Sequence, residues 1–351
     1  MTKVNRLLPE WTPLDAVILA WPHTQTDWAP WLDSVVETYL SLINEINNSG
    51  TGVILLCRKQ DCEDVSAQLS STNKVLLLPA EYNDTWVRDY AFLTCRQGQH
   101  NIPVEYNFNG WGNKFDATLD NQVNERYLAP LCQQPLTSYP LVCEGGALEI
   151  DQQGHLLSTA LCLTNPERNG QLSLQQYTER FQLQLGANAV SILEHGHLEG
   201  DDTDGHIDTL VRFTPTNGLV IQACSNRPAD AHFEGLTALV NECQQRIATH
   251  SIFELPLPYV ENQEGDRLPA SYANFLICND SILAPIYQQP EDQEALRVLQ
   301  QAYPSYTIVA INCLPLVQQY GSLHCITMQV PVETLLPDIT HKIFQGVSIY
   351  D

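Results

Sequence analysis

DGHIDTLVRF, residues 204–213, leads from a polar loop directly into an apolar stretch, and four other segments have the same form. These are DTWVRDYAF (84–92), CEGGALEI (143–150), SYANFLICN (271–279) and GSLHCITMQV (321–330). Their key polar residues are separated by 55, 62, 68 and 51 positions and are Asp89, Glu144, His206, Asn274 and Cys325. A period of roughly 60 residues with one supersecondary unit per repeat indicates a closed radial array, in which five loops meet at one site. The alternative is a coincidence in a strand-rich chain.

Short apolar runs rich in Val, Ile and Leu alternate with helix-like segments along the chain. The runs have the length of buried strands, about four to eight residues, and are Ala16–Trp21, Val53–Cys57, Val75–Pro79, Leu156–Leu163, Gly218–Cys224, Phe275–Cys278 and Ser281–Pro285. Helices are predicted at Ala29–Asn47, Leu172–Leu185, Ala229–Ala248 and Glu291–Ala302. Strands mixed with helices throughout predict an α/β or α+β protein.

The composition of the 351 residues fits a globular protein with a sizeable core. No apolar run reaches the length of a transmembrane helix. The start, MTKVNRLLPEWTPLDAVILA, has a Glu and a Pro before any apolar stretch, unlike a secretory signal. The 11 cysteines form no CxxC pair and no zinc-site spacing. We therefore expect mostly reduced cysteines in a cytoplasmic protein that does not bind membranes.

The net charge of −24 argues against nucleic acid as a partner, because phosphate binding needs clustered Lys and Arg. An acidic cleft would instead attract and concentrate small cations. The alternative is that the charge serves solubility alone.

The stretch His195–Arg212 contains three His and five acidic residues immediately before an apolar strand. If His206 and Asp208 lie on an extended strand, a base and a carboxylate face one spot, because side chains at i and i+2 point the same way. A solvated acidic turn is the structural alternative. A metal site is the competing functional interpretation, with the candidate ligands His195, His197, Asp202 and His206.

Three other segments carry groups suited to chemistry. On a strand, Trp86 and Arg88 would share one face and Asp89 the other, and a Trp beside carboxylates suits a flat cation such as guanidinium. Glu144 precedes a Gly pair, which lets backbone approach a ligand closely. Cys325 follows a Gly-containing loop at a strand entrance, a reasonable position for a nucleophile, although spacing alone does not distinguish it from the other cysteines.

The chain resembles the agmatine deiminases, a family that also includes the bacterial-type peptidylarginine deiminases. The resemblance covers nearly the whole length, through WPHTQTDW, DTWVRD, EGGALE, DDTDGHID with its trailing RF, and HCIT. The last four motifs, in this order and at these distances, are highly specific. The family implies a pentein fold, a five-bladed α/β propeller with pseudo-fivefold symmetry, as a single catalytic domain over residues 1–351.

The resemblance also implies a cysteine mechanism that needs neither a metal nor a cofactor. It implies that Cys325 is the nucleophile and His206 the general acid and base. Asp89 and Asp208 would grip the guanidinium, and Glu144 would orient His206. The substrate-binding positions implied or considered are Trp86, Asn274, Asp202 and Asp204, with Asp27 and Glu199 as further candidates for the distal ammonium.

Agmatine is the expected substrate, hydrolysed to N-carbamoylputrescine and ammonia in polyamine (putrescine) biosynthesis. Lys and Arg number only 17, so a partner for an α-carboxylate is scarce and the amine is favoured over arginine. The chain departs from the family pattern at Tyr90-Ala91-Phe92 and at Gln319-Tyr320-Gly321-Ser322-Leu323, where glycines are usual. These departures leave peptidyl-arginine or another guanidine open as the substrate. A metal-dependent amidohydrolase and a non-catalytic binding protein remain alternative functions. Whether the protein forms a homo-oligomer is left open by the sequence.

Overall fold

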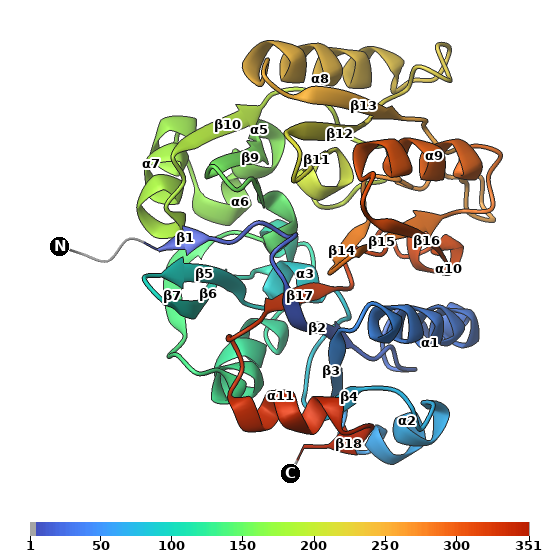
Figure 1. The fold of residues 1–351 in the computed structure, drawn as a ribbon. Helices are drawn as coiled ribbons and strands as arrows, with labels where there is room; N and C mark the ends of the chain where they lie inside the picture. Colours follow the sequence, from blue (N-terminus) through green and yellow to red (C-terminus); the bar gives the residue numbers. More distant parts are fainter. Residues whose placement is uncertain (1–4, 351) are drawn as a thin grey trace.

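A computed structural model of the chain describes residues 5–350. The strands of this part form five separate sheets, and the longer helices lie toward the outside of the molecule (Figure 1). The prediction of a mixed α/β fold is confirmed. The predicted domain, 1–351, also includes residues 1–4 and 351, which lie outside the described residues.

The strands are grouped as follows. The first sheet contains β1 (Arg6–Leu7), β5 (Leu93–Gln97), β6 (His100–Asn107) and β7 (Thr137–Val142). The second contains β8 (Glu149–Ile150), β9 (His155–Thr159) and β10 (Ala189–Leu193), and the third β11 (Val211–Phe213), β12 (Gly218–Gln222) and β13 (Ser251–Leu255). The fourth contains β14 (Leu276–Cys278), β15 (Ser281–Ile286) and β16 (Thr307–Asn312). The fifth contains β17 (Met328–Pro331), β2 (Leu14–Ala20), β3 (Gly52–Cys57), β4 (Val75–Pro79) and β18 (Ser348–Ile349).

One three-strand arrangement recurs in all five sheets: a strand antiparallel to its neighbour, which is parallel to the third. The arrangement comprises β5–β6–β7, β8–β9–β10, β11–β12–β13, β14–β15–β16 and β17–β2–β3. Parallel neighbours need a crossover connection, which is usually helical. Four of these crossovers carry α7 (Leu174–Leu185), α8 (Phe233–Arg246), α9 (Asp292–Ala302) and α1 (Leu32–Asn48). The repeat in the sequence therefore corresponds to a repeat in the structure.

The long helices form where the apolar spacing predicts them. In α1, Val35, Tyr39, Leu42 and Ile46 are buried, a spacing of three to four residues that places one face of the helix on the core. The helix α7 starts two residues later than predicted because Ser173 is its N-cap, in a capping box with Gln176. The predicted starts of α8 and α9 are also within a few residues of those observed.

The remaining helical segments are short. They are α2 (Cys62–Gln68), α3 (Val87–Tyr90), α4 (Gly110–Asn113), α5 (Ala160–Leu163), α6 (Pro166–Asn169), α10 (Leu314–Val317), α11 (Pro337–Phe344), η1 (Ala29–Trp31), η2 (Asp120–Gln122), η3 (Asn124–Leu128), η4 (Ala129–Leu131), η5 (Gly145–Ala147) and η6 (Ile207–Thr209). The predicted strand Leu156–Leu163 is wrong in its second half. Its strand part ends at Thr159, whose hydroxyl accepts a hydrogen bond from the Cys162 N–H and thereby starts α5.

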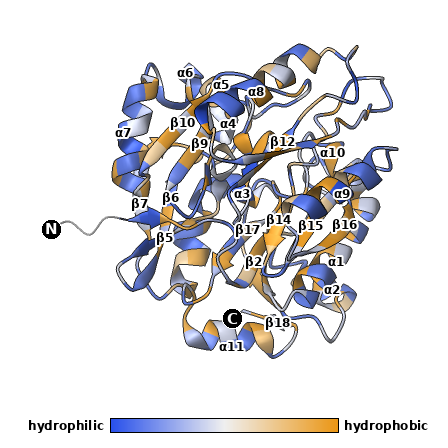
Figure 2. Cartoon of the chain, turned by 45° about the horizontal axis from the view of Figure 1, so that its top comes forward, coloured by the Kyte–Doolittle hydropathy of each residue, from blue (hydrophilic) through white to orange (hydrophobic). Residues whose placement is uncertain are grey.

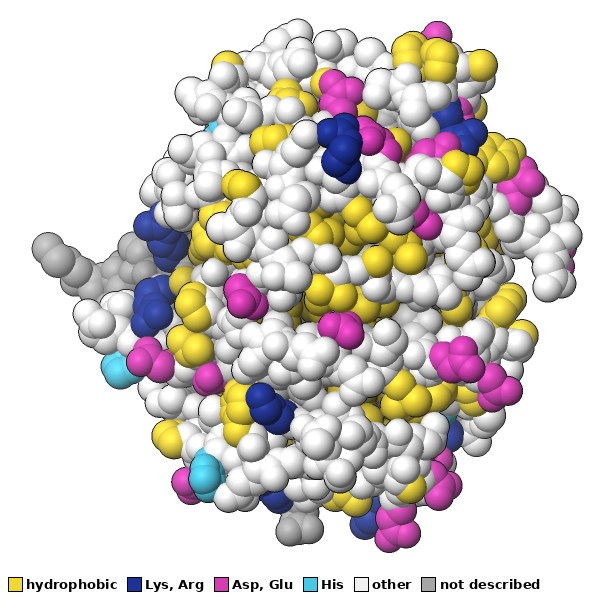
Figure 3. Space-filling model, turned by 45° about the vertical axis from the view of Figure 1, so that its right-hand side comes forward, with side chains coloured by type: hydrophobic (Ala, Val, Ile, Leu, Met, Phe, Trp, Pro, Cys, Tyr) yellow, Lys and Arg dark blue, Asp and Glu magenta, His cyan; other side chains and the backbone are white. Residues whose placement is uncertain are grey.

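Apolar strands lie at the centre, and helices with one polar face cover them (Figure 2). On the face drawn in Figure 3, acidic side chains are spread among neutral ones rather than gathered in one block. Over residues 5–350, no helix has both the length and the apolar character that a membrane crossing requires.

Candidate active site

Each of the five key polar residues lies just before the first strand of one three-strand unit. Asp89 precedes β5, Glu144 precedes β8, His206 precedes β11, Asn274 precedes β14 and Cys325 precedes β17. Contacts join these loops: His206 lies 3.5 Å from Asp89 and 3.9 Å from Glu144, and the Cys325 sulfur lies 3.4 Å from Asn274 Oδ1. The chain thus brings together residues that are 51 to 68 positions apart in sequence, as the spacing of the loops predicted.

The local geometry around DGHID and DTWVRD differs from the extended strand on which the side-chain directions were predicted. His206 is the N-cap of the 3-10 helix η6 and Asp208 lies in its first turn. Trp86 is likewise the residue before the short helix α3, which contains Arg88 and Asp89. The predictions from strand alternation are therefore wrong, because each of the two segments forms a short helical turn before its strand begins. Even so, Trp86, Asp89, His206 and Asp208 all line one cavity.

This cavity has a volume of about 170 Å³ and is bordered by acidic and aromatic side chains. Its lining is Asp27, Asp84, Trp86, Asp89, Trp111, Phe115, Asp201, Asp202, Thr203, His206, Asp208, Thr209, Pro269, Gln319, Tyr320, Gly321 and Cys325. Six of these residues are Asp, and no Lys or Arg is among the described residues that form the wall. Such a cavity favours a cation with an apolar part.

Asp89 is held from three sides. The Gly146 N–H donates to Oδ1 at 2.9 Å, and the Trp111 Nε1–H donates to Oδ2 at 2.8 Å. The Nδ1 atom of His206 lies 3.5 Å from Oδ1. Burial raises the pKa of Asp89, and the neighbouring His206 only partly opposes this. A cation bound in the cavity would favour the ionised carboxylate.

His206 is buried and is surrounded by carboxylates. Burial by itself lowers the pKa of an imidazole, but the negative charges of Asp89, Glu144 and Asp208 outweigh burial, so the pKa of His206 is raised. Its Nε2 atom lies 3.9 Å from Glu144 Oε2 and has no hydrogen-bond partner. This arrangement favours a protonated imidazole facing the cavity, which is the state that a general acid requires.

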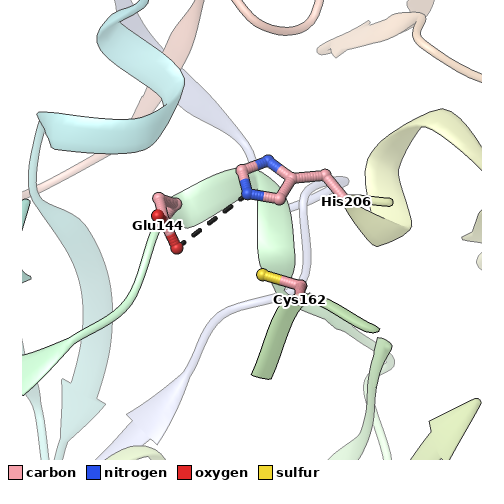
Figure 4. Close-up of side chains that lie close together, drawn as sticks. All are labelled: Glu144, Cys162 and His206. Atoms are coloured by element: carbon pink, nitrogen blue, oxygen red, sulfur yellow. Dashed lines mark ion pairs between the residues drawn. The ribbon is translucent and has the colours of Figure 1, made fainter. Parts of the chain in front are cut away.

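Glu144, Cys162 and His206 lie close together (Figure 4), with one potential ligand atom from each within 4.8 Å of the others. Arg168, however, already binds the Glu144 carboxylate: its Nε donates to the two oxygens at 2.8 and 3.1 Å. Arg168 also pairs with Asp204 at 2.6 Å. The carboxylate of Glu144 is therefore fixed beside His206 by a buried ion pair, which agrees with an orienting role.

Cys325 is the one half-buried cysteine among the 11, and the others are buried; all are free thiols. Its sulfur donates to Asn274 Oδ1 at 3.4 Å. Burial, together with the charges of Asp208 and Asp89, raises the pKa of this thiol well above its ordinary value. The raised pKa favours the protonated thiol, and a cationic ligand would make the thiolate easier to form.

Trp86 is packed so tightly that the loop before Cys325 must have a glycine. A Cβ on Gly321 would lie 2.2 Å from the Trp86 ring, well inside contact distance. Trp28 lies against the same ring, with centroids 5.4 Å apart. Trp86 thus forms a rigid wall of the cavity, covered by the loop that leads to Cys325.

The candidates for the distal end of a substrate separate into two groups. Asp202 lines the cavity, and burial with the adjacent Asp201 raises its pKa to about 7. Asp204 is outside the cavity lining, and its carboxylate is bound by Arg168, Lys114 and Asn165. Asp27 lines the cavity as well, whereas Glu199 is exposed and outside the lining.

Asp201 also lines the cavity, but its oxygens already accept hydrogen bonds. One oxygen binds the Thr203 N–H at 2.9 Å and the other the Gly205 N–H at 2.6 Å. Asp201 therefore shapes the loop before His206. The carboxylate of Asp202 accepts no hydrogen bond from another side chain in the described part of the chain, so it remains available for a ligand.

Three aromatic residues of the cavity were missed by the sequence interpretation: Trp111, Phe115 and Tyr320. Trp111 lies in α4, where four successive residues from Gly110 to Asn113 have positive φ. The glycines on both sides of Trp111 were the available signal for such a turn. The candidate ligands of the competing metal interpretation, His195 and His197, are exposed and do not line the cavity.

Residues 6–331 match the family model of Porphyromonas-type peptidyl-arginine deiminase. The protein belongs to this family, as the motifs predicted. A Vibrio parahaemolyticus protein named "Putative agmatine deiminase" is 31% identical over 92% of this chain and 95% of its own.

Two solved structures resemble the chain over 95% of its length. One, described as a "Putative Arginine Deiminase" from Porphyromonas gingivalis, has a TM-score of 0.88 and 37% identity, covering 95% of this chain and 100% of that one. The other is a C. jejuni agmatine deiminase, in which a cysteine is replaced by serine and substrate is bound. It has a TM-score of 0.86 and 28% identity, covering 95% of this chain and 97% of that one.

Proposed function

We propose that the protein is an agmatine deiminase, which hydrolyses agmatine to N-carbamoylputrescine and ammonia through a covalent intermediate on Cys325. One observation carries the proposal: a thiol, an imidazole and two carboxylates from three separate loops border one acidic cavity. Curated relatives and solved structures named agmatine deiminase support it. The five sheets would be the blades of a pseudo-fivefold propeller forming a single catalytic domain. Reduced cysteines are consistent with a cytoplasmic enzyme.

The guanidinium would lie between Asp208 and Asp89. Asp208 Oδ1 is buried and has no hydrogen-bond partner among residues 5–350, whereas Oδ2 accepts from His324 Nδ1 at 2.7 Å. A free carboxylate oxygen at a cation-sized cavity is an acceptor for a planar N–H fork. Asp89 retains lone pairs beyond those used by Gly146 and Trp111. The two carboxylates would hold the guanidinium carbon in line with the sulfur of Cys325.

The substrate would also activate the nucleophile. Asp208 and Asp89 raise the pKa of the Cys325 thiol, so a bound guanidinium that neutralises them would lower that pKa again. The thiol releases its proton to solvent, and the thiolate attacks the guanidinium carbon. The His206 imidazolium donates its proton to one nitrogen, the C–N bond breaks and ammonia leaves. A thiouronium remains on Cys325.

Water completes the reaction. Neutral His206 accepts a proton from water, whose oxygen adds to the thiouronium carbon. The C–S bond breaks, which frees the substituted urea and restores the Cys325 thiol. Glu144, held by Arg168, stabilises the imidazolium of His206 in both half-reactions. Asn274 would hold the sulfur through its side-chain oxygen and offers an unpartnered Nδ2 to the reacting centre.

The distal ammonium of agmatine would bind Asp202, while Asp27 and Asp84 add negative potential. Trp86 would pack against the substrate. Among the described residues, the lining contains no Lys or Arg to neutralise the α-carboxylate of free arginine, which favours the amine. Peptidyl-arginine has no such carboxylate and is the second candidate, because the family model carries that description.

Ammonia release in a coupled assay, compared across agmatine, arginine, peptidyl-arginine and methylated guanidines, tests the proposal. We expect agmatine to give the highest kcat/KM. Cys325→Ala abolishes turnover, whereas Cys243→Ala, which replaces a buried cysteine of α8, retains it. A chelator leaves the rate unchanged. The proposal fails if no guanidino compound yields ammonia, or if chelation stops the reaction while Cys325→Ala does not.

A further inference from the structure

The side chain of His324, the residue before Cys325, is buried between two carboxylates. Its Nδ1 lies 2.7 Å from Asp208 Oδ2, and its Nε2 lies 2.8 Å from Glu10 Oε1. Ionised carboxylates only accept hydrogen bonds, so both ring nitrogens must carry a hydrogen. The geometry therefore calls for an imidazolium at position 324. This residue belongs to none of the groups assigned to the reaction above.

Glu10, at the other end of the imidazole, is firmly anchored. It reaches the site from the segment between β1 and β2. Its Oε1 also accepts from Arg88 at 3.2 Å, and its Oε2 accepts from Gln329 at 3.0 Å and from Arg212. Burial would raise the pKa of Glu10, but Arg212, His324 and Arg88 together hold it well below its usual value. Glu10 is thus a fixed negative charge on the side of the His324 ring opposite Asp208.

Asp208, at the near end, is oriented by the same imidazole. The bond from His324 occupies Oδ2, so that Oδ1 of this cavity-lining residue remains buried and without a hydrogen-bond partner among residues 5–350. Burial would raise the pKa of Asp208, but the hydrogen bond and the charge of His324, together with the charges of His206 and Arg212, lower it. His324 therefore sets the direction of the free oxygen and contributes to keeping the carboxylate ionised.

The backbone of His324 is equally constrained. Its N–H donates to Asn274 Oδ1 at 2.9 Å and to the Asn274 carbonyl at 3.1 Å. The adjacent Cys325 carbonyl accepts from the Arg88 N–H at 3.1 Å. The imidazole that directs Asp208 is thereby attached to the same short segment as the sulfur, so the distance between nucleophile and carboxylate is set by one rigid unit.

We infer that Glu10 and His324 are positioning residues, forming a carboxylate–imidazolium–carboxylate relay that aims Asp208 Oδ1 at the guanidinium. The inference rests on the proposed function, because it assigns Asp208 to the substrate. Neither Glu10 nor His324 lines the cavity, so each acts through Asp208 rather than by touching the ligand. If Glu10 and His324 only stabilised the fold, substituting them would change substrate affinity only as far as it changed folding.

The test is a double-mutant cycle on agmatine affinity, measured by calorimetry in the Cys325→Ala background so that no turnover interferes. The amide nitrogen of Gln reaches the position of Nε2, and that of Asn reaches the position of Nδ1. H324Q should thus keep the bond to Glu10 and lose the bond to Asp208, whereas H324N keeps the bond to Asp208. A lost hydrogen bond to a charged group corresponds to about a tenfold change in Kd or more.

We expect H324Q to weaken agmatine binding about tenfold and H324N clearly less. In the D208N background, H324Q should change Kd less than about twofold, because the route to the substrate is already broken. Two results would overturn the relay: H324Q costs as much affinity in the D208N background as it does with Asp208 intact, or H324Q and H324N cost the same. Thermal melting confirms that each variant is folded.

If H324Q does not fold, E10Q takes its place in the cycle, since the Gln side chain preserves the shape of Glu10. E10Q should weaken binding several-fold in a manner that depends on Asp208, and an effect independent of Asp208 would refute the inference. The parent Cys325→Ala protein separates the two proposals. If it binds no guanidino compound, the proposed function fails and the relay with it; if it binds agmatine but shows no coupling, only the relay fails.

Discussion

Gly146 offers the sharpest test of how closely the catalytic groups are packed. A Cβ at this position would lie 2.6 Å from His206 Nδ1, 2.8 Å from Asp89 Oδ1 and 3.1 Å from Asp208 Oδ2. Ordinary contacts begin at 3.4 Å, so Gly146→Ala forces a shift of about 0.8 Å between the loop and His206. A misplacement of about 1 Å can cost roughly 100-fold in rate, which corresponds to about 2.7 kcal/mol of transition-state free energy. We therefore expect kcat/KM to fall about 100-fold.

The assay is steady-state ammonia release from agmatine, with thermal unfolding followed by circular dichroism. The backbone of Gly146 does not have the positive φ that disfavours alanine, so the effect arises from the neighbouring side chains. Gly235→Ala is the matched control, because a Cβ there meets nothing within 4 Å and the residue lies in α8. Gly235→Ala should keep full activity and gain about 0.5–1 kcal/mol of helix stability. A Gly146→Ala enzyme with kcat/KM within twofold of the wild type would refute the reasoning.

Three further predictions concern the tail, the buried ion pair and the mouth of the cavity. The pKa of Asp202 is raised to about 7, so this carboxyl is mostly neutral at lower pH, and the KM for agmatine should fall as pH rises through 7. In Asp202→Asn that pH dependence should vanish and KM should be about tenfold higher; a pH dependence equal to that of the wild type would contradict the role of Asp202. Arg168→Ala leaves the buried Glu144 charge unpaired and should lower the free energy of unfolding by about 3–5 kcal/mol, as measured by urea denaturation. The control Arg297→Ala removes an exposed pair with Glu294 and should change it by less than about 0.5 kcal/mol, and equal losses would count against this account. The side chain of Tyr320 occupies space in the cavity, and its φ of 63° is one that glycine adopts readily. Tyr320→Gly should therefore raise kcat/KM for longer aminoalkylguanidines relative to kcat/KM for agmatine. An unchanged ratio of the two values would show that Tyr320 does not determine substrate selectivity.

The fold class and the main site residues were predictable because both depend on local patterns. Apolar runs identified the central strands, and the spacing of buried residues identified helices such as α1. The motifs around Asp89, Glu144, His206 and Cys325 identified the family, which the family model confirms. The roles assigned to these residues stay predictions until the variants are measured.

Other features could not be read from neighbouring residues. The strand-face argument for His206 and Asp208 was wrong, because the segment forms a 3-10 turn, and the N–H groups of Gly205 and His206 before it donate hydrogen bonds to Asp201 and Thr203. Trp111 reaches Asp89 only through a turn with successive positive φ angles. Asp202 and Asp204 are equivalent in the sequence, yet Arg168 and Lys114 occupy one of them and leave the other on the cavity.

The sequence by itself determined which groups are present: a thiol, an imidazole and several carboxylates at strand entrances, in a chain whose acidity suits a cation. Only the tertiary structure decided the direction, the charge and the availability of each of these groups. Glu10 lies 314 positions from His324 in the sequence but within hydrogen-bond distance of it in space. Direction, charge and availability of a side chain depend on burial and on partners that long-range packing supplies. For this reason Asp208 has a free oxygen and a lowered pKa, while Asp204, four residues earlier, serves a structural ion pair.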